Sequence, residues 1–262
     1  LAKEYQKEDD IVLAKVNGRL RELYLQLTED CRISFITTRQ QEGMAAYRRS
    51  MTLLLLKALY HQAGHEHIRR VGIHFSVSSG YYCTVDGDVT LDQDFLDKVE
   101  ARMRELIAQK VPIDKKTIGT DDAIALFSQY GMKDKEKLFH YRRASKVNIY
   151  DMGGFEDYYY GYMVPDTSYL GAFSLHLYED GFVLQMPQRK DPKTVPAFEP
   201  ENKMFRVRKE SLKWGEMLEI PTVGLLNDYI VHHGIHDLIL IQEALQEKRI
   251  AEIAAQIAER KT

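Results

Sequence analysis

The residues best placed for chemistry lie on a helix predicted for residues 47–60, where positions 49 and 53 are one turn apart on one face. Two histidines at this spacing can share a metal ion or flank a water molecule. This chain has Arg49 and Leu53 there, and these side chains can do neither. The apolar residues that recur with the period of a core-facing helix are Met51, Leu54, Leu55, Ala58 and Leu59.

Two groups of histidines have spacings that a metal site could use. The two histidines of the first group are separated by one residue. The second group spans one helical turn but is interrupted by Gly234. No cysteine or carboxylate pattern completes a ligand set, so surface or helix-capping roles are favoured and no metal site is predicted. Cys83 lies on a predicted strand and is expected to be a small core residue. The histidines are His65, His67, His232, His233 and His236.

Three basic pairs occur along the chain, and two interpretations of them stay open. They are either solvated charges that complement helix ends, or part of an RNA- or phosphate-binding surface on which tyrosines offer stacking faces. On the second interpretation Arg48, Arg142 and Arg143 are the candidate phosphate contacts. Tyr159 is equally suited to filling a pocket with its ring. The residues concerned are Arg48, Arg49, Arg69, Arg70, Arg142 and Arg143, with Tyr82, Tyr158, Tyr159, Tyr160 and Tyr162.

The composition is that of an ordinary soluble protein. The 262 residues carry 29% charged side chains and a net charge of -3, so no global basic field attracts nucleic acid. Two cysteines rule out a disulfide scaffold and indicate a reducing cytoplasm. The longest apolar run, 53–56, is too short to span a membrane, and no secretory signal heads the chain. The first residues look like the middle of a helix, and we expect the sequence to begin inside a domain.

The order of predicted elements indicates an α+β protein with a small β-rich module, a mixed middle region and a helical end. Asn17-Gly18 is a two-residue hairpin signal, and residues 90–93 fit a capping box. Residues 120–122 are predicted to cap a short helix. Predicted strands cover 11–16, 19–23, 31–36, 71–77, 81–85, 146–150, 173–177 and 181–186, and predicted helices cover 93–110, 208–218, 223–231 and 235–259.

These segments together resemble the N-terminal half of threonyl-tRNA synthetases. Residues 14–23 are similar to the second hairpin of the TGS domain, a ubiquitin-like β-grasp. Residues 47–186 resemble the editing domain, with Ser79-Gly80-Tyr81-Tyr82 similar to its Gly-aromatic-Tyr strand. The resemblance implies a truncated TGS-like module over 1–43, an editing-like two-layer α/β domain with an antiparallel sheet and a β extension over 44–206, and a helical connector over 207–262.

The residues that carry editing in that family are replaced here. The family's His-x-x-x-His falls on Arg49 and Leu53, and its later Cys-x-x-x-His falls on Tyr159 and Met163. A family Asp on the Tyr-rich strand falls on Thr84. Hydrolysis of an ester needs a polarised water or an activating base, and none of these side chains supplies one. We therefore expect a degenerate pocket without catalytic residues, formed by Arg49, Leu53, Tyr82, Thr84, Tyr159 and Met163.

Residues 213–224 and 242–251 resemble a different group, the bacterial uridine kinase-like nucleoside kinases that carry such a region before their kinase domain. These 262 residues contain no phosphate-binding loop of the Gly-x-x-x-x-Gly-Lys-Ser/Thr type. The resemblance implies a kinase domain beyond residue 262 in the same polypeptide. That domain would use ATP and Mg²⁺ for phosphoryl transfer, whereas this region would need no cofactor.

The main hypothesis from the sequence is a non-catalytic accessory region of a uridine kinase-like protein in the cytoplasm. It would sense a small molecule, bind RNA or mediate assembly, including homo-oligomers, without a membrane partner. One alternative is a free-standing editing hydrolase with a rebuilt site that uses Tyr82, Tyr159 and a nearby histidine. Another is a plain tRNA- or RNA-binding module, whose binding would weaken steeply with salt.

Overall fold

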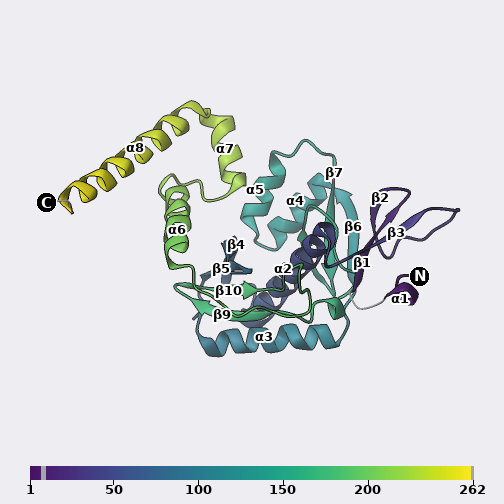
Figure 1. The fold of residues 1–262 in the computed structure, drawn as a ribbon. Helices are drawn as coiled ribbons and strands as arrows, with labels where there is room; N and C mark the ends of the chain where they lie inside the picture. The colour runs from purple at the N-terminus through teal and green to yellow at the C-terminus, as the bar shows by residue number, and fades with distance from the viewer. Residues whose placement is uncertain (7–9, 261–262) are drawn as a thin grey trace.

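The computed structural model describes residues 1–6 and 10–260. Within these residues the strands form three antiparallel sheets, and the last three helices extend along one side of the molecule (Figure 1). The predicted α+β class with antiparallel sheets and C-terminal helices is confirmed. The strands of the middle region divide between two of the sheets. The domain boundaries at 43 and 206 remain a prediction.

The N-terminal sheet has β1 in the centre, with antiparallel partners on both sides. Asn17 and Gly18 have φ angles of 49° and 79°, so the predicted two-residue turn joins the first two strands. Apolar residues of the central strand, Val12 and Leu13, belong to the same core as the middle region. The elements are α1 (Ala2–Tyr5), β1 (Ile11–Val16), β2 (Arg19–Glu22) and β3 (Ile33–Thr37).

Helix α2 (Gln41–Ala63) passes through the centre of the molecule (Figure 1). Leu53, Leu54 and Leu55 are consecutive and fully buried, so the helix is enclosed on more faces than the predicted apolar stripe requires. At its first turn Gly43 lies against the chain that leaves β3, and a Cβ atom there would be 2.1 Å from the carbonyl oxygen of Thr37. The small sheet and α2 are therefore packed backbone to backbone.

The four-stranded sheet has the order β4-β5-β10-β9. Helices α2 and α3 cover one face, and the other face packs against α6 through Phe205. The N-cap of α3 is Asp92, which accepts from the backbone N–H of Phe95 at 2.8 Å. The predicted capping box at Thr90 was therefore wrong by two residues, because a carboxylate nearer the helix caps it. The elements are β4 (Ile68–Val77), β5 (Gly80–Gly87), α3 (Gln93–Ala108), β9 (Ser174–Tyr178), β10 (Gly181–Gln185) and α6 (Asn202–Met217).

The second sheet of the middle region has the order β6-β7-β8. The predicted cap at 120–122 was wrong, because α4 begins at Thr120 without a side-chain cap. The Thr120 hydroxyl donates to the carbonyl of Ala144 instead. The elements are β6 (Ile113–Gly119), α4 (Thr120–Gln129), α5 (Lys133–His140), β7 (Lys146–Met152), β8 (Phe155–Tyr158) and the 3-10 turn η1 (Thr167–Tyr169).

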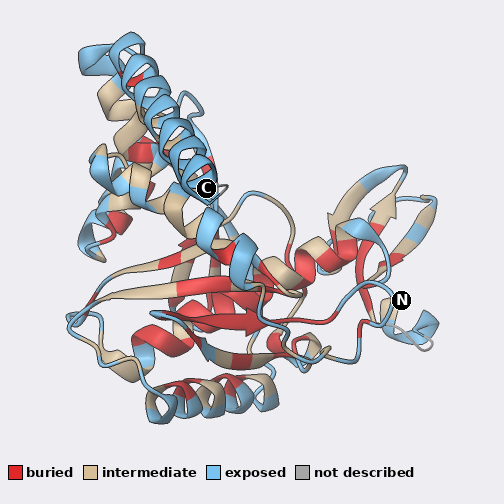
Figure 2. Ribbon diagram, turned by 60° about the vertical axis from the view of Figure 1, so that its left-hand side comes forward, coloured by how far each residue is buried: buried red, intermediate tan, exposed pale blue. Residues whose placement is uncertain are grey.

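The C-terminal helices differ in how firmly they are attached. On α6, Lys209 pairs with Asp180 and also lies 3.2 Å from the Tyr82 hydroxyl. Helix α7 (Val223–His233) packs on α5, where the Tyr141 hydroxyl donates to Asp228. Helix α8 (His236–Glu259) is almost entirely exposed and projects from the rest (Figures 1 and 2). No helix in the described part of the chain is long and apolar enough to cross a membrane.

Gly43→Ala is expected to lower the free energy of unfolding by about 1–3 kcal/mol, because the new Cβ would overlap the Thr37 carbonyl. Gly171→Ala is the matched control, since nothing lies within 4 Å of its Cβ position. Urea unfolding measures both variants. Equal stability of the two would contradict the close approach of α2 to the small sheet.

Candidate functional site

A cleft of about 1300 Å³ runs along α2. The lining residues from this helix recur every three or four positions, so they form one face. From the first to the last of them the helix rises about 28 Å. The face that remains open to the cleft is therefore long and narrow, while most of the rest of α2 is buried. The residues are Gln41, Met44, Ala45, Arg48, Arg49, Thr52, Leu56 and Tyr60.

The opposite walls come from four other parts of the chain. Strand β4 runs back along α2 after the turn at 64–67, and the start of α5, the end of β8 and the loop after β10 complete the lining. The loop after β10 is tied to the segment before α2, because Arg39 donates to the Lys190 carbonyl at 2.7 Å. The lining residues are Arg39, Arg69, Arg70, Val71, Ile73, His74, Tyr81, Met132, Asp134, Lys135, Asp157, Tyr158, Tyr159, Gln188, Arg189 and Lys190.

The cleft has a large excess of positive charge. Among the described residues, eight arginine and lysine side chains line it against two aspartates, Asp134 and Asp157. Asp157 is paired with Lys135, and Arg70 is paired with Asp86 outside the cleft lining. Within residues 1–6 and 10–260, no carboxylate lies at ion-pair distance from Arg48, Arg49, Arg69, Arg189 or Lys190. An anionic ligand would relieve this local repulsion.

The Arg48 side chain is partly buried at the edge of the cleft. Its Nε atom is buried and has no hydrogen-bond partner in the part of the chain that the structure describes. A buried N–H of a charged group without a partner is costly. Arg48 also lines the cleft, and guanidinium groups bind phosphate or carboxylate oxygens with charge-assisted hydrogen bonds.

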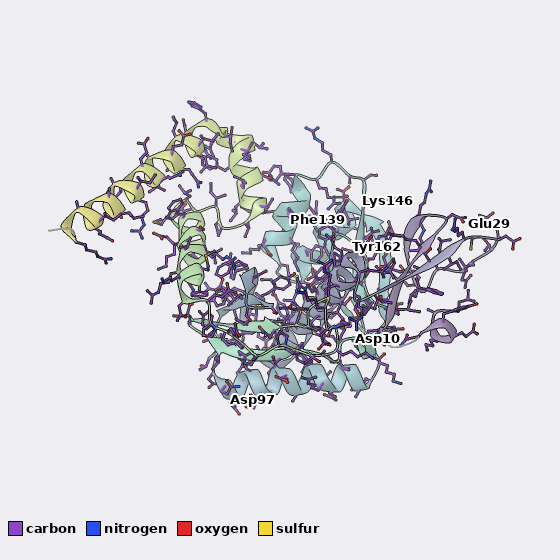
Figure 3. The ribbon with its side chains drawn as sticks, in the orientation of Figure 1. Asp10, Glu29, Asp97, Phe139, Lys146 and Tyr162 are labelled. Carbon is purple, nitrogen blue, oxygen red and sulfur yellow. The ribbon has the colours of Figure 1, made fainter. Side chains whose placement is uncertain are left out.

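Arg49 is held by the segment that follows β8. Its Nε donates to the carbonyl of Tyr162 at 3.0 Å, and Gly161 lies directly against the guanidinium. Figure 3 labels Tyr162, on the side of the molecule where the small sheet lies. Burial lowers the pKa of Arg49 from its ordinary value, but an arginine begins so far above neutrality that it keeps its charge. Arg49 is thus a fixed cation at the cleft wall.

Four of the six residues predicted to form a degenerate pocket belong to this region. Arg49 and Tyr159 line the cleft. Leu53 and Met163 are buried in the main core behind it. The Met163 sulfur lies 3.2 Å from the hydroxyl of Ser50, which is next to Arg49 on α2. The two segments that the resemblance pairs are therefore in contact.

Tyr82 and Thr84 lie on the other face of the four-stranded sheet. Tyr82 packs on Phe205 of α6 with ring centroids 4.9 Å apart, so its ring points away from α2. Thr84 is two residues further along β5 and shares that face. It reaches the cleft only indirectly, because its hydroxyl lies 2.8 Å from Nε2 of His74, which lines the rim.

The predicted phosphate contacts are divided as well. Arg48 lines the cleft. Arg142 bonds the hydroxyl of Tyr158, which is a lining residue, and its guanidinium lies 5.1 Å from that ring. Arg143 is exposed and does not line the cleft. The sequence analysis missed Arg189 and Lys190, which lie in a proline-containing loop whose position over the cleft has no local signal.

Several side chains limit the chemistry that the cleft can perform. Burial raises the pKa of Tyr159 well above its ordinary value and that of Tyr60 to about 12, so both phenols stay protonated at neutral pH. Burial lowers the pKa of His74, aided by Arg70, so its imidazole is neutral there. In the described residues no group of three or more His, Cys, Asp and Glu side chains could hold a metal ion. His65 stacks on Tyr60 with centroids 4.6 Å apart.

Comparison with known proteins finds similarity to threonine–tRNA ligases over part of this chain, and no protein-family model matches it. The ligase of Pelobacter propionicus is 32% identical over 167 residues, which is 63% of this chain and 25% of the relative. The ligase of Citrifermentans bemidjiense is 33% identical over 63% of this chain and 25% of the relative. That of Methylococcus capsulatus is 32% identical over 62% of this chain and 25% of the relative. This chain is homologous to one region of these ligases and spans about a quarter of their length.

Gly161→Ala is expected to displace Arg49, because the new Cβ would lie 2.8 Å from the guanidinium carbon at a φ of +127°. The loss of stability should exceed that of Gly154→Ala, which has a φ of +84° and nothing within 4 Å, and therefore reports backbone strain alone.

Thermal unfolding of both glycine variants, alone and combined with Arg49→Ala, measures the contact as a double-mutant cycle. The excess cost of Gly161→Ala should shrink by about half or more when Arg49 is absent. If the excess loss of stability in Gly161→Ala is the same with and without Arg49, the guanidinium does not lie against Gly161.

Proposed function

We propose that this chain binds the single-stranded end of an RNA in the cleft along α2, with the acceptor end of a tRNA as the first candidate. It binds without hydrolysing the ligand. The observation that carries this proposal is the surplus of cations that line the cleft in the described chain, Arg48 and Arg49 on the open face of α2 and the others on the walls opposite. Homology to threonine–tRNA ligases supports tRNA as the RNA to test first.

A single strand suits this cleft better than a duplex. Four tyrosines from α2, β5 and the end of β8 line the cleft beside the cations. Three of them are half-buried and can offer ring faces to unstacked bases, whereas Tyr60 is buried against His65. About 28 Å of helix face would hold a few nucleotides of an extended strand. The tyrosines are Tyr60, Tyr81, Tyr158 and Tyr159.

Binding without hydrolysis follows from what stands at the positions of the editing residues. A general base works best with a pKa near neutrality, and Arg49 is permanently charged. Leu53 and Met163 are buried in the core. The degenerate pocket is therefore an anion-binding wall, in which a guanidinium holds phosphate where the resemblance places a histidine.

An editing hydrolase is the second candidate, and His74 is the observation in its favour. Its imidazole is neutral, lies at the cleft rim and contacts the Thr84 hydroxyl, so it has the protonation state that a general base needs. No activated water or nucleophile accompanies it among the residues that the sequence singled out. Tyr82 faces α6, and Tyr159 stays protonated.

The uridine kinase-like parent remains a hypothesis that rests on residues 213–224 and 242–251. Exposed isoleucines on α8, such as Ile250, Ile253 and Ile257, agree with a helix that contacts a further domain. A phosphate-binding loop in the coding frame beyond residue 262 would support it, together with ATP, Mg²⁺ and a cytoplasmic location. A synthetase-like catalytic domain there would contradict it.

Arg48→Gln and Arg49→Gln are each expected to raise the Kd for a deacylated tRNA about five- to tenfold at near-physiological salt. Each should reduce the slope of log K against log salt by about 1, because one phosphate contact is lost. Fluorescence anisotropy across a salt series measures both quantities.

Arg143→Gln is the matched control, since this exposed arginine lies outside the cleft and its loss should leave affinity unchanged. A tRNA without its single-stranded 3′ end should bind more weakly than the intact tRNA. If all three arginine variants weaken binding equally, the RNA is held by a diffuse surface attraction and the cleft is not its specific site.

The chain is expected to release no amino acid from a mischarged threonine tRNA above the rate in buffer. Acid-gel or thin-layer separation of charged and deacylated tRNA measures the rate. Release that disappears in His74→Ala would establish the second candidate in place of the first.

A further inference from the structure

The segment 161–164 is held by a different side chain at each successive peptide group. The Tyr150 hydroxyl lies 2.6 Å from the Gly161 carbonyl oxygen. Arg49 donates to the carbonyl of Tyr162 at 3.0 Å. The N–H of Met163 donates to Glu22 at 3.2 Å, and that of Val164 donates to the hydroxyl of Ser50 at 3.0 Å. Hydrogen bonds therefore fix Tyr162, Met163 and Val164, and the single Tyr150 hydroxyl proton is shared between Gly161 and Glu22, which lie equally close to it.

Of these side chains Glu22 comes from furthest away. It is the last residue of β2 in the small N-terminal sheet, and its side chain is 7% exposed. One carboxylate oxygen accepts from Met163 N–H and lies 2.6 Å from the Tyr150 hydroxyl. The other accepts from Tyr24 at 2.7 Å and from Lys115 at 3.4 Å.

We propose that Glu22 is a positioning residue through which the small N-terminal sheet sets the place of Arg49 in the cleft. This inference rests on the proposed function for its ligand. The path is short, from the Glu22 carboxylate to the Met163 amide and the Tyr150 hydroxyl, then to the carbonyl groups of Gly161 and Tyr162, and then to the guanidinium.

The environment of Glu22 makes this path stiff. Lys115 pairs with Glu22 and also lies 5.1 Å from the centre of the Tyr162 ring, so the same cation holds the carboxylate and the segment. Burial raises the pKa of Tyr150 above its ordinary value, and the hydrogen bond to Glu22 adds to this, so the phenol remains a donor. A carboxylate buried among its own partners cannot move without leaving them unsatisfied.

The consequence is that the small sheet acts on the cleft without lining it. Within the described residues no side chain from β1, β2 or β3 lines the cleft. A partner or ligand that displaced β2 would nevertheless move the segment 161–163, and with it the cation that stands where the resemblance places a histidine. The small sheet would thereby control anion binding by changing the geometry of Arg49 and leaving its charge unaltered.

The test compares three variants. Glu22→Ala removes the acceptor of the Met163 amide. Glu22→Gln keeps an acceptor oxygen of the same shape. Tyr24→Phe is the matched control, because it removes one hydrogen bond from Glu22 on the side of the small sheet and leaves the segment 161–163 untouched.

Two readouts need no RNA. In Glu22→Ala the Met163 amide should exchange its hydrogen about tenfold faster or more, and the Val164 amide should change less, because Ser50 still holds it. The NMR resonance of the Arg49 Nε–H should shift, since its acceptor moves. Glu22→Gln and Tyr24→Phe should resemble the wild type in both.

Binding of deacylated tRNA is the third readout, and Glu22→Ala should weaken it at least threefold. An unchanged Arg49 resonance in Glu22→Ala overturns the inference. Changes in Glu22→Gln and Tyr24→Phe as large as those in Glu22→Ala, in the Arg49 resonance and the Met163 exchange rate, overturn it as well. Failure of the wild type to bind tRNA overturns the proposed function alone, because the two NMR readouts still decide the positioning. If Glu22→Ala does not fold, Tyr150→Phe must shift the Arg49 resonance for the inference to stand.

Discussion

The burial of α2 is the constraint on which the rest of the structure depends. A helix enclosed on most of its faces must be covered by several layers, and here the small sheet, the four-stranded sheet, α3 and the second sheet all contribute to one core. The face left open runs along α2, and outside it only a few residues such as Glu42, Lys57 and His61 of the described helix are exposed or half-buried. Because side chains on that face recur every three or four residues, a short stretch of sequence places two adjacent arginines and several apolar residues along one cleft.

Charge in this cleft works against stability and in favour of binding. Cations that lack carboxylate partners repel one another, and partial burial removes some of the water that would screen them. Arg49 and Arg48 illustrate the two ways of holding such charges. The first is fixed by a carbonyl at 3.0 Å, and the second keeps a buried Nε without a partner in the described chain. An anion that binds to such a surface gains free energy because it relieves the repulsion among the cations.

Homology to threonine–tRNA ligases and the replacement of the editing residues agree with one account. Arg49 contacts the segment that carries Met163, so the two stretches that the resemblance pairs lie together in this structure. On the proposed function, a guanidinium and apolar packing stand where the resemblance implies groups that can activate water. The fold can keep the shape of a site after its reactive groups are gone, since shape is set mainly by buried neighbours.

The sequence by itself determined several of the local elements, although it did not predict β6, α5 or β8. Helical periodicity gave α2, and Asn17-Gly18 gave the first hairpin, because backbone geometry and turn chemistry act over a few residues. Strand periodicity also fixed that Tyr82 and Thr84 share a face, but only packing against α6 decided that this face points away from the cleft. The placing of Arg189 over α2, and the reach of Glu22 into the segment 161–164, depend on contacts between residues far apart in the chain. No local pattern encodes such contacts, because they follow from how whole elements bury their apolar faces together.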